Sequence, residues 1–349
     1  MADWRAAQRL ESAQALPAEV YLDPALAAAE RAQVFARSWQ LVGRASALAN
    51  PGDLGCADAA GVPLLLIRDG QDLRALHNVC RHRAGPLATG PAQGQTQLRC
   101  RYHGWTYQLD GRLRSGPELE AIGGLDRESV RLPAAALHEW QGLIWAAIDA
   151  APDFAEVCAG IDARVAPFAL ADYVFERRVV YEAACNWKLY VENYLEGYHV
   201  PHIHPALNRL LDYREYRTEC ARWHSLQWSP LDTGASFYGA GEALYYFIWP
   251  NTMLNILPGR LQSNRILPLG VDRCRIEFDY YYAAPVRAGM PERIAEDQRL
   301  ADLVQAEDIE ICEQLQRALA SGSYQSGRIH PTRESGVHHF QELYRQAMR

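Results

Sequence analysis

Two short segments of the chain each bring one cysteine and one histidine close together. The segment HNVCRHRAGP contains Cys80 and His82, and the segment LRCRYHGWTYQLDG contains Cys100 and His103. Glycine and proline punctuate both segments, which predicts turns between strands. Thiolate and imidazole ligands together favour a thiophilic transition metal. The pattern therefore predicts a small β domain whose turns hold a metal centre.

The pairing of unlike ligands distinguishes between two kinds of metal centre. A structural zinc site also uses two cysteines and two histidines, but its ligands usually come as like pairs, Cys-x2–4-Cys and His-x3–5-His. A [2Fe–2S] cluster of the Rieske type takes two thiolates on one iron and two imidazoles on the other. Two mixed pairs fit the second arrangement directly. We therefore interpret these four residues as Rieske cluster ligands, with a zinc site as the alternative.

Composition excludes several classes of function. The chain has 349 residues, enough for two domains, and its net charge of −7 argues against nucleic acid or an anionic membrane as a partner. No apolar run approaches the roughly 18 residues that cross a bilayer, and the N-terminal MADWRAAQRLES lacks a signal-peptide core. The 8 cysteines are dispersed, which indicates reduced thiols and a cytoplasmic location.

The pattern of apolar residues divides the chain into three parts. Residues 1–37 have helical spacing, and residues 38–150 consist of short apolar runs separated by Gly, Pro and Asp, which predicts a small β domain. Residues 151–349 are mixed. In this third part we expect a helix over 186–199, aromatic strands after it, and a long helix from about 292 to 320.

A second candidate site lies in NWKLYVENYLEGYHVPHIHP. As a helix, this stretch places Glu192, Glu196 and His199 on one face. A proline then ends the helix, and His204 follows in the turn. Two imidazoles at such a helix end can converge on one ion, with His202 as an alternative ligand. The other interpretation is a solvated charged face with histidines at a helix terminus.

The predicted long helix contains a carboxylate in an unfavourable place. The stripe along this helix runs through Leu300, Val304, Asp308, Ile311 or Cys312, Leu315 and Leu319, and every member except Asp308 is apolar. Asp308 lies in the middle, and a buried carboxylate is costly unless it is paired, for example with an arginine, or binds a metal. The neighbouring Glu307, Glu310 and Glu313 lie off the stripe and are expected to be solvated or salt-bridged. Two histidines and one carboxylate form the facial triad of non-haem Fe(II) oxygenases.

From about Trp39 to its C-terminus the chain resembles the catalytic (alpha) subunits of the Rieske non-haem iron oxygenases. The resemblance rests on CRHRAGP, CRYHGW, NWKLYVENYLEGYH and EDIEICEQLQ. It implies an α+β fold: an N-terminal Rieske [2Fe–2S] β domain, and a C-terminal helix-grip catalytic domain of antiparallel sheet and helices on which residues 1–37 pack. Gly104 and Trp105 look like the family's cluster-capping loop.

The resemblance also implies roles for individual residues. The seven metal ligands that it implies are Cys80, His82, Cys100 and His103 for the cluster and His199, His204 and Asp308 for the mononuclear Fe(II). Glu196 matches the acid that bridges a cluster histidine and an iron histidine of two subunits, so it counts among the catalytic residues. The implied assembly is a homo-oligomer, most simply a head-to-tail trimer.

The implied activity is that of a terminal oxygenase with O₂ as co-substrate, an EC 1.14 oxidoreductase. No GxGxxG follows a predicted strand, so electrons must come from a separate NAD(P)H-dependent reductase of the flavin and ferredoxin type. The alternatives are a Rieske electron carrier with a degenerate second domain and a zinc-stabilised binding module. Monooxygenation is expected, with dioxygenation left open.

The substrate is expected to be a small organic molecule. Within the family the chain most resembles choline monooxygenases, in stretches such as ALYYFIWPNTMLNILPGR. A quaternary ammonium group needs an aromatic cage, and the candidate residues are Trp223, Trp228, Phe237, Tyr238, Tyr245, Phe247 and Trp249. The alternatives are that these are ordinary strand residues, or that the same machinery hydroxylates or demethylates an aromatic compound.

Overall fold

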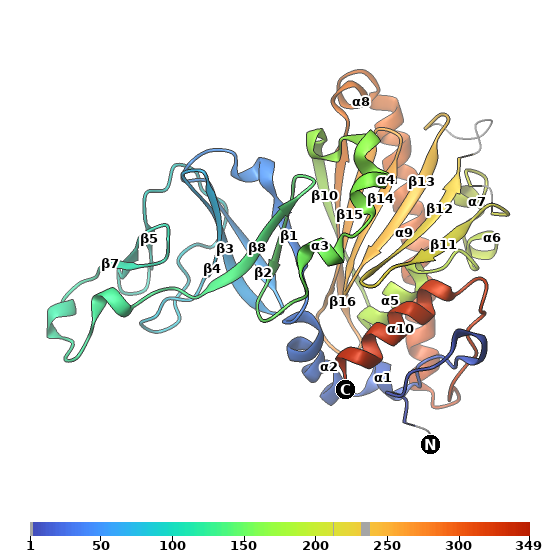
Figure 1. Cartoon of the computed structure of the whole chain (residues 1–349), viewed down its shortest axis with the longest axis horizontal. Helices are drawn as coiled ribbons and strands as arrows, with labels where there is room; N and C mark the ends of the chain where they lie inside the picture. Colours follow the sequence, from blue (N-terminus) through green and yellow to red (C-terminus); the bar gives the residue numbers. More distant parts are fainter. Residues whose placement is uncertain (1–2, 212, 232–237) are drawn as a thin grey trace. The chain divides into compact units, whose positions relative to one another are not determined.

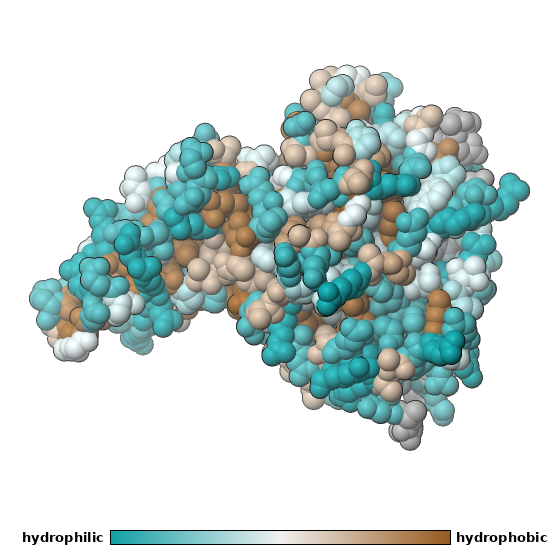
Figure 2. All heavy atoms as spheres, in the orientation of Figure 1, coloured by the Kyte–Doolittle hydropathy of each residue, from teal (hydrophilic) through white to brown (hydrophobic). Residues whose placement is uncertain are grey.

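The computed structural model describes residues 3–211, 213–231 and 238–349, and it consists of two compact units (Figure 1). One unit is Phe35–Pro152. The other combines Met1–Val34 with Asp153–Arg349. The surface facing the viewer in Figure 2 is mostly hydrophilic, with hydrophobic residues confined to small areas. None of the described helices is both long enough and apolar enough to cross a membrane.

The unit Phe35–Pro152 is built of antiparallel strands. Its larger sheet has the order β1-β9-β8-β4-β3-β2, and its smaller sheet has the order β5-β6-β7. The strands of the larger sheet are β1 (Gln40–Arg44), β2 (Leu54–Ala59), β3 (Val62–Asp69), β4 (Asp72–His77), β8 (Ala134–Trp140) and β9 (Leu143–Ala147). Those of the smaller sheet are β5 (Leu98–Arg99), β6 (Thr106–Tyr107) and β7 (Leu113–Ser115). Its short 3₁₀ helices are η3 (Ala45–Leu48), η4 (Leu119–Ala121) and η5 (Arg127–Ser129).

The other unit contains an antiparallel sheet with the order β10-β16-β15-β14-β13-β12-β11. Its strands are β10 (Val174–Ala183), β11 (Arg217–Cys220), β12 (His224–Pro230), β13 (Glu242–Ile248), β14 (Thr252–Leu257), β15 (Arg260–Pro268) and β16 (Cys274–Tyr282). Strands β13 to β16 are buried along nearly their whole length. That burial accounts for the aromatic and aliphatic residues of β13, β14 and β16, whereas β15 also buries polar side chains such as Arg260, Gln262 and Asn264.

Helices pack against this sheet, with α5 contacting β15 and α10 contacting β11. The α-helices are α1 (Glu19–Leu22), α2 (Pro24–Glu30), α3 (Phe154–Val157), α4 (Ile161–Val165), α5 (Trp187–Tyr194), α6 (Val200–Ile203), α7 (Pro205–Asn208), α8 (Ala284–Gly289), α9 (Pro291–Ala320) and α10 (Ser335–Ala347). The shorter helices of this unit are η1 (Leu10–Ser12), the π-helical turn η2 (Arg31–Phe35), η6 (Ala166–Phe168) and η7 (Leu170–Asp172).

A buried ion pair fastens the N-terminal segment to the rest of its unit. Glu30 of α2 accepts a hydrogen bond from Lys188 Nζ of α5 at 2.5 Å and another from the Tyr344 hydroxyl of α10 at 2.7 Å. The indole of Trp187 donates to the same carboxylate at 2.7 Å. Because a buried charge is costly without partners, this network requires α2, α5 and α10 to pack together.

The antiparallel sheets with packed helices confirm the predicted α+β class. The long helix expected at about 292–320 is α9, and the aromatic strands are β13 and β16. The helix expected over 186–199 is wrong in its second half, because α5 ends at Tyr194 and α6 begins only at Val200. Glu192 consequently does not share a helix face with His199. Its carboxylate accepts hydrogen bonds from Tyr21 and Gln341 instead.

Candidate metal centres

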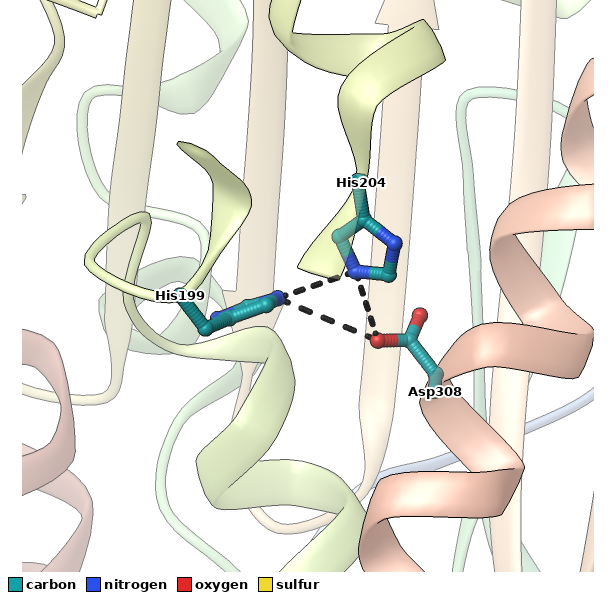
Figure 3. Close-up of side chains that lie close together, drawn as sticks. All are labelled: His199, His204 and Asp308. Atoms are coloured by element: carbon teal, nitrogen blue, oxygen red, sulfur yellow. Dashed lines mark hydrogen bonds and ion pairs between the residues drawn. The ribbon is translucent and has the colours of Figure 1, made fainter. Parts of the chain in front are cut away.

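His199, His204 and Asp308 converge on one point in the larger unit (Figure 3). The two imidazole Nε2 atoms lie 3.1 Å apart. Asp308 Oδ1 lies 3.0 Å from Nε2 of His204 and 3.8 Å from Nε2 of His199. Among the residues that the structure describes, this is the single group of three or more His, Cys, Asp or Glu side chains whose ligand atoms lie within 4.8 Å of one another.

Two prolines give the histidines their positions. Pro201 lies in the first turn of α6, where proline is tolerated, and Pro205 disfavours a helical conformation at the preceding His204, so α6 ends after one turn. His199 immediately precedes α6 and His204 immediately follows it, and the N–H of His204 donates to the carbonyl of Val200 at 3.0 Å. A single helical turn between them therefore turns both side chains towards the same point on α9.

Carboxylates behind the two imidazoles set their orientation. Glu196 Oε1 lies 2.6 Å from Nδ1 of His199, and Glu307 Oε2 lies 2.7 Å from Nδ1 of His204. Each carboxylate accepts the Nδ1 proton, which leaves the Nε2 lone pairs directed at each other. Two acceptors 3.1 Å apart repel unless a cation lies between them. The donor set therefore fits a divalent metal held by neutral histidines.

The electrostatics of His204 and Asp308 agree with a cation at this point. Burial favours a lower pKa for His204, but the hydrogen bonds and charges of Asp308 and Glu307 outweigh it, so the pKa is raised. Asn193 of α5 donates to Asp308 Oδ1 at 2.6 Å and holds that carboxylate in place. A metal ion would take the position that a proton occupies in its absence.

The acids near Asp308 differ in part from the sequence prediction that they would be solvated or salt-bridged. Glu307, expected to be solvated or salt-bridged, holds the His204 ring instead. Glu313 accepts the Ala184 N–H at 2.9 Å, whereas Glu310 is exposed and bonds to Gln314. The exposed His202 lies outside the triad. Periodicity could not identify Glu307, because it lies about 100° around the helix from Asp308 and its partner is distant in sequence.

The smaller unit holds Cys80 and Cys100 in two turns with the same hydrogen bonds. In each turn the cysteine N–H donates to the carbonyl five residues later at 2.9 Å, and its carbonyl accepts from the N–H four residues later at 3.0 Å. That fourth residue is Ala84 in one turn and Gly104 in the other, with φ of 58° and 76°. Two equivalent turns therefore present their ligands as a matched pair.

The four predicted cluster ligands differ in burial, with the cysteines more buried than the histidines. Cys80 and Cys100 are buried in the hydrophobic core of this unit, whereas His82 is exposed and His103 is half-buried. The two imidazole rings lie with centroids 4.5 Å apart, and His82 stacks on Trp105 at 4.9 Å. Thiolates on the inside and imidazoles on the outside match the two unlike irons of a Rieske cluster.

Two further residues shape this cradle. The Tyr107 hydroxyl lies 3.2 Å from Cys80 Sγ and accepts the Arg81 N–H at 3.0 Å. Burial raises the pKa of Tyr107, so it stays protonated and can donate to a thiolate. A Cβ on Gly85 would lie 2.8 Å from Cys100 Sγ, so a larger residue there would push the sulfur out of place. The residues present therefore fit a [2Fe–2S] cluster.

A cavity of about 140 Å³ adjoins the triad, with His199, His204 and Asp308 in its wall. Its aromatic members are Tyr190, Tyr194, Tyr216, Tyr238, Tyr245 and Phe278. They come from α5, from the turn before β11, from the turn that contains Tyr238 and from strands β13 and β16, so the wall is assembled from distant parts of the chain. Tyr194 donates to Asn255 Oδ1 at 2.7 Å, which fixes one ring.

The predicted aromatic cage agrees with this wall only in part. Tyr238 and Tyr245 line the cavity, and Phe237 lies outside the described residues. The four that do not belong to its described wall are Trp223, Trp228, Phe247 and Trp249. The predicted cage residues all lie between positions 223 and 249, so they did not include Tyr190 and Tyr194 of α5, which also line the cavity. Nothing in the sequence links these two tyrosines to the sheet.

Strand geometry explains these differences. Trp228 follows the cavity residue Gln227 in β12, so it points to the opposite face, where it packs under Arg164. Phe247 and Trp249 share the face of Tyr245 but lie further along the chain, and both pack on Phe340 of α10 at 5.8 and 5.7 Å. Trp223 precedes β12 and lies under the Arg222 guanidinium.

Comparison with known proteins identifies the family of both units. The model of the ring hydroxylating alpha subunit (catalytic domain) matches residues 170–238 and 221–349, and the model of the Rieske [2Fe-2S] domain matches residues 38–132. The chain is 32% identical to the chloroplastic choline monooxygenase of Beta vulgaris over 343 residues, covering 95% of this chain and 76% of that protein. It is 28% identical to the carnitine monooxygenase oxygenase subunit of Escherichia coli (strain K12) over 364 residues, covering 97% and 95%.

Solved structures share the fold over the whole chain. The quaternary ammonium Rieske monooxygenase CntA in complex with L-carnitine superposes with a TM-score of 0.87 at 25% identity, covering 98% of this chain and 97% of that one. Naphthalene 1,2-dioxygenase from Rhodococcus shares the fold with a TM-score of 0.78. These matches confirm the predicted family, fold class and cofactors and disagree with the zinc-module alternative. The chain belongs to the Rieske non-haem iron oxygenases, as a catalytic alpha subunit that uses a [2Fe–2S] cluster and a mononuclear iron to activate O₂.

Proposed function

We propose that this chain is the terminal oxygenase of a system that monooxygenates a small quaternary ammonium compound of the choline, carnitine or betaine kind. The observation that carries the proposal is the tyrosine-rich wall of the cavity beside the triad. Electron-rich ring faces attract a trimethylammonium group by about 0.5–2 kcal/mol for each desolvated contact. The relatives named choline and carnitine monooxygenase support the same substrate class.

The proposal assigns the seven ligands to two centres. The cluster ligands are Cys80, His82, Cys100 and His103, and the iron ligands are His199, His204 and Asp308. When bound there, the two groups supply electrons and O₂ activation. Glu196 and Glu307 keep the imidazole protons on Nδ1 and so direct Nε2 towards the metal, while Asn193 orients the Asp308 carboxylate. The cavity tyrosines hold the substrate cation and exclude water.

The proposal includes a head-to-tail homo-oligomer, most simply a trimer, in which Glu196 links two subunits. Glu196 Oε1 holds the His199 ring, and Oε2 accepts backbone N–H groups of Tyr198 and His199. In this chain alone Tyr198 is exposed, so a neighbour can approach this edge. A CntA structure with 24% identity is described as giving insight into inter-subunit electron transfer in that protein. Electrons enter from a separate NAD(P)H-dependent reductase of the flavin and ferredoxin type.

Glu196→Gln is expected to retain both metal centres and to slow reoxidation of the reduced cluster by about 10- to 100-fold when substrate and O₂ are added. The amide has one acceptor oxygen instead of two and no charge, so it cannot hold histidines of two subunits together. Single-turnover stopped-flow absorbance measures the rate. Glu192→Gln is the matched control, because that carboxylate bonds to Tyr21 and Gln341. Normal cluster oxidation in Glu196→Gln would show that electrons take another route.

The substrate class is tested by O₂ uptake and binding with a surrogate reductase. Replacing the trimethylammonium group of a substrate by a neutral tert-butyl group is expected to weaken binding about 10-fold or more, since two or three aromatic contacts are lost. Tyr245→Leu should weaken binding of the cation, and Trp228→Leu should not, because Trp228 faces away from the cavity. Turnover of a plain aromatic acid, with none of any quaternary amine, would favour the aromatic alternative.

A further inference from the structure

A buried arginine lies in the wall of the same cavity. Arg260, the first residue of β15, is only 5% exposed. Its Nε lies 3.0 and 3.1 Å from the two carboxylate oxygens of Asp297 in α9, and its Nη2 donates to Gln262. No hydrogen bond among the described residues uses Nη1. The outer edge of the guanidinium, which carries Nη1, is therefore available to a ligand.

Asp297 cannot occupy that edge as well. Its oxygens already accept from the hydroxyls of Tyr238 and Tyr282, the latter at 2.5 Å, in addition to the arginine Nε. These contacts hold the carboxylate at the inner side of Arg260. A guanidinium held in this way fixes the direction of its unused Nη1 N–H groups, which can donate charge-assisted hydrogen bonds to a carboxylate.

The position of Arg260 relative to the iron triad follows from α9. Asp297 and Asp308 are eleven residues apart in this helix, which is three turns, so they share a face about 16 Å apart along the axis. Leu300, Ala301 and Val304 lie between them and line the cavity. The cavity thus has the triad towards one end, an apolar and aromatic middle, and the Arg260 guanidinium towards the other.

We infer that the substrate is a zwitterion whose carboxylate pairs with Arg260 while its trimethylammonium group lies among the tyrosines near the triad. This inference rests on the proposed function and narrows it. Arg260 lies beside Asp297 and the triad includes Asp308, three turns further along α9. This separation of Arg260 from the triad favours an ω-trimethylammonio carboxylate with a spacer of several carbons over one with a single carbon. A simple cation such as choline would leave the buried guanidinium edge without a partner, which is unfavourable.

The inference is tested by isothermal titration calorimetry on the anaerobic holoenzyme. The probes are 4-(trimethylammonio)butanoate and its primary amide, which differ in charge but hardly in shape. The wild-type protein is expected to bind the carboxylate about 10- to 100-fold more tightly than the amide, as a charge-assisted hydrogen-bonded pair predicts. Glycine betaine should bind more weakly than the butanoate.

Arg260→Lys should reduce that preference to about 3-fold or less, because an ammonium has no second donor nitrogen that could reach the ligand while the first pairs with Asp297. Arg265→Lys is the matched control. Arg265 is also buried in β15 and pairs with Glu277 at 3.3 Å, but its side chain points to the other face of the strand. The Arg265→Lys variant should prefer the carboxylate over the amide as strongly as the wild type does.

Equal affinity of the wild type for the carboxylate and the amide would overturn the inference and make Arg260 a residue that only fastens α9 to the sheet. The proposed function would survive that result if both probes bind more tightly than the neutral tert-butyl analogue. Failure of every quaternary amine to bind would remove the proposed function and this inference together. If Arg260→Lys does not fold, the affinities of the wild-type protein for the carboxylate and for the amide still test the inference.

Discussion

Asp308→Ala is expected to empty the mononuclear site while leaving the red-brown cluster in place. Iron content should fall from about three to about two atoms per chain, and turnover should be lost, because two histidines alone cannot complete the facial triad. The measurements are iron analysis, the visible spectrum, and O₂ uptake with substrate. Asn193, which donates to Asp308 Oδ1, would also lose its acceptor.

Two further variants in α9 test whether the loss of iron is specific to Asp308. Glu310→Ala should keep all its iron, since Glu310 is exposed and, within the described part of the chain, accepts a hydrogen bond only from Gln314. Glu307→Gln should weaken iron binding about 10- to 100-fold without abolishing it, because Glu307 orients His204 from behind the ring. Full iron occupancy in Asp308→Ala would refute its assignment as a ligand.

Cys100→Ser is expected to abolish the visible spectrum of the cluster. A serine oxygen is a hard ligand and does not replace a thiolate on a cluster iron. The sulfur of Cys100 is also enclosed, with the backbone of Gly85 directly against it, so no solvent ligand can take its place. Iron content should fall by about two atoms per chain, while the mononuclear site still binds Fe(II).

The matched control for this variant is Cys56→Ser. Cys56 belongs to the same unit but is exposed and lies in β2, where its thiol contacts only the Gly90 carbonyl at 3.6 Å among the bonds identified. The visible spectrum of the Cys56→Ser variant should equal that of the wild type. An unchanged spectrum in Cys100→Ser would show that other residues hold the cluster.

The candidate cluster site could be predicted from the sequence because that site is local. Each turn carries its cysteine and histidine within four residues, and each closes through backbone hydrogen bonds inside the same segment. The mixed pairing alone therefore indicated two unlike irons, and the structure places the thiols inside and the imidazoles outside, as that pairing requires. The long helix α9 was predictable for a similar reason, since its apolar residues recur with the helical period.

The mononuclear site was only partly encoded in local pattern. Asp308 stood out because a carboxylate inside an apolar stripe needs a partner. His199 and His204 were predicted as ligands although the helix expected to reach His199 ends at Tyr194. The position of Glu307 behind His204 could not be predicted, because whether an acid is solvated or bonded to a histidine 103 residues away depends on the packing of α7 against α9.

Which side chains line the cavity depends on how the strands and helices pack together. Aromatic strands predicted an aromatic wall, but the face of each strand, the distance along it and the position of α5 select Tyr194 and Tyr245 and exclude Trp228 and Phe247. Arg260 and Asp297 are 37 residues apart and meet because α9 packs across the start of β15. The chain sequence thus specifies ligands that lie within one turn, whereas a cavity wall is a property of elements that meet only after the sheet and helices have packed.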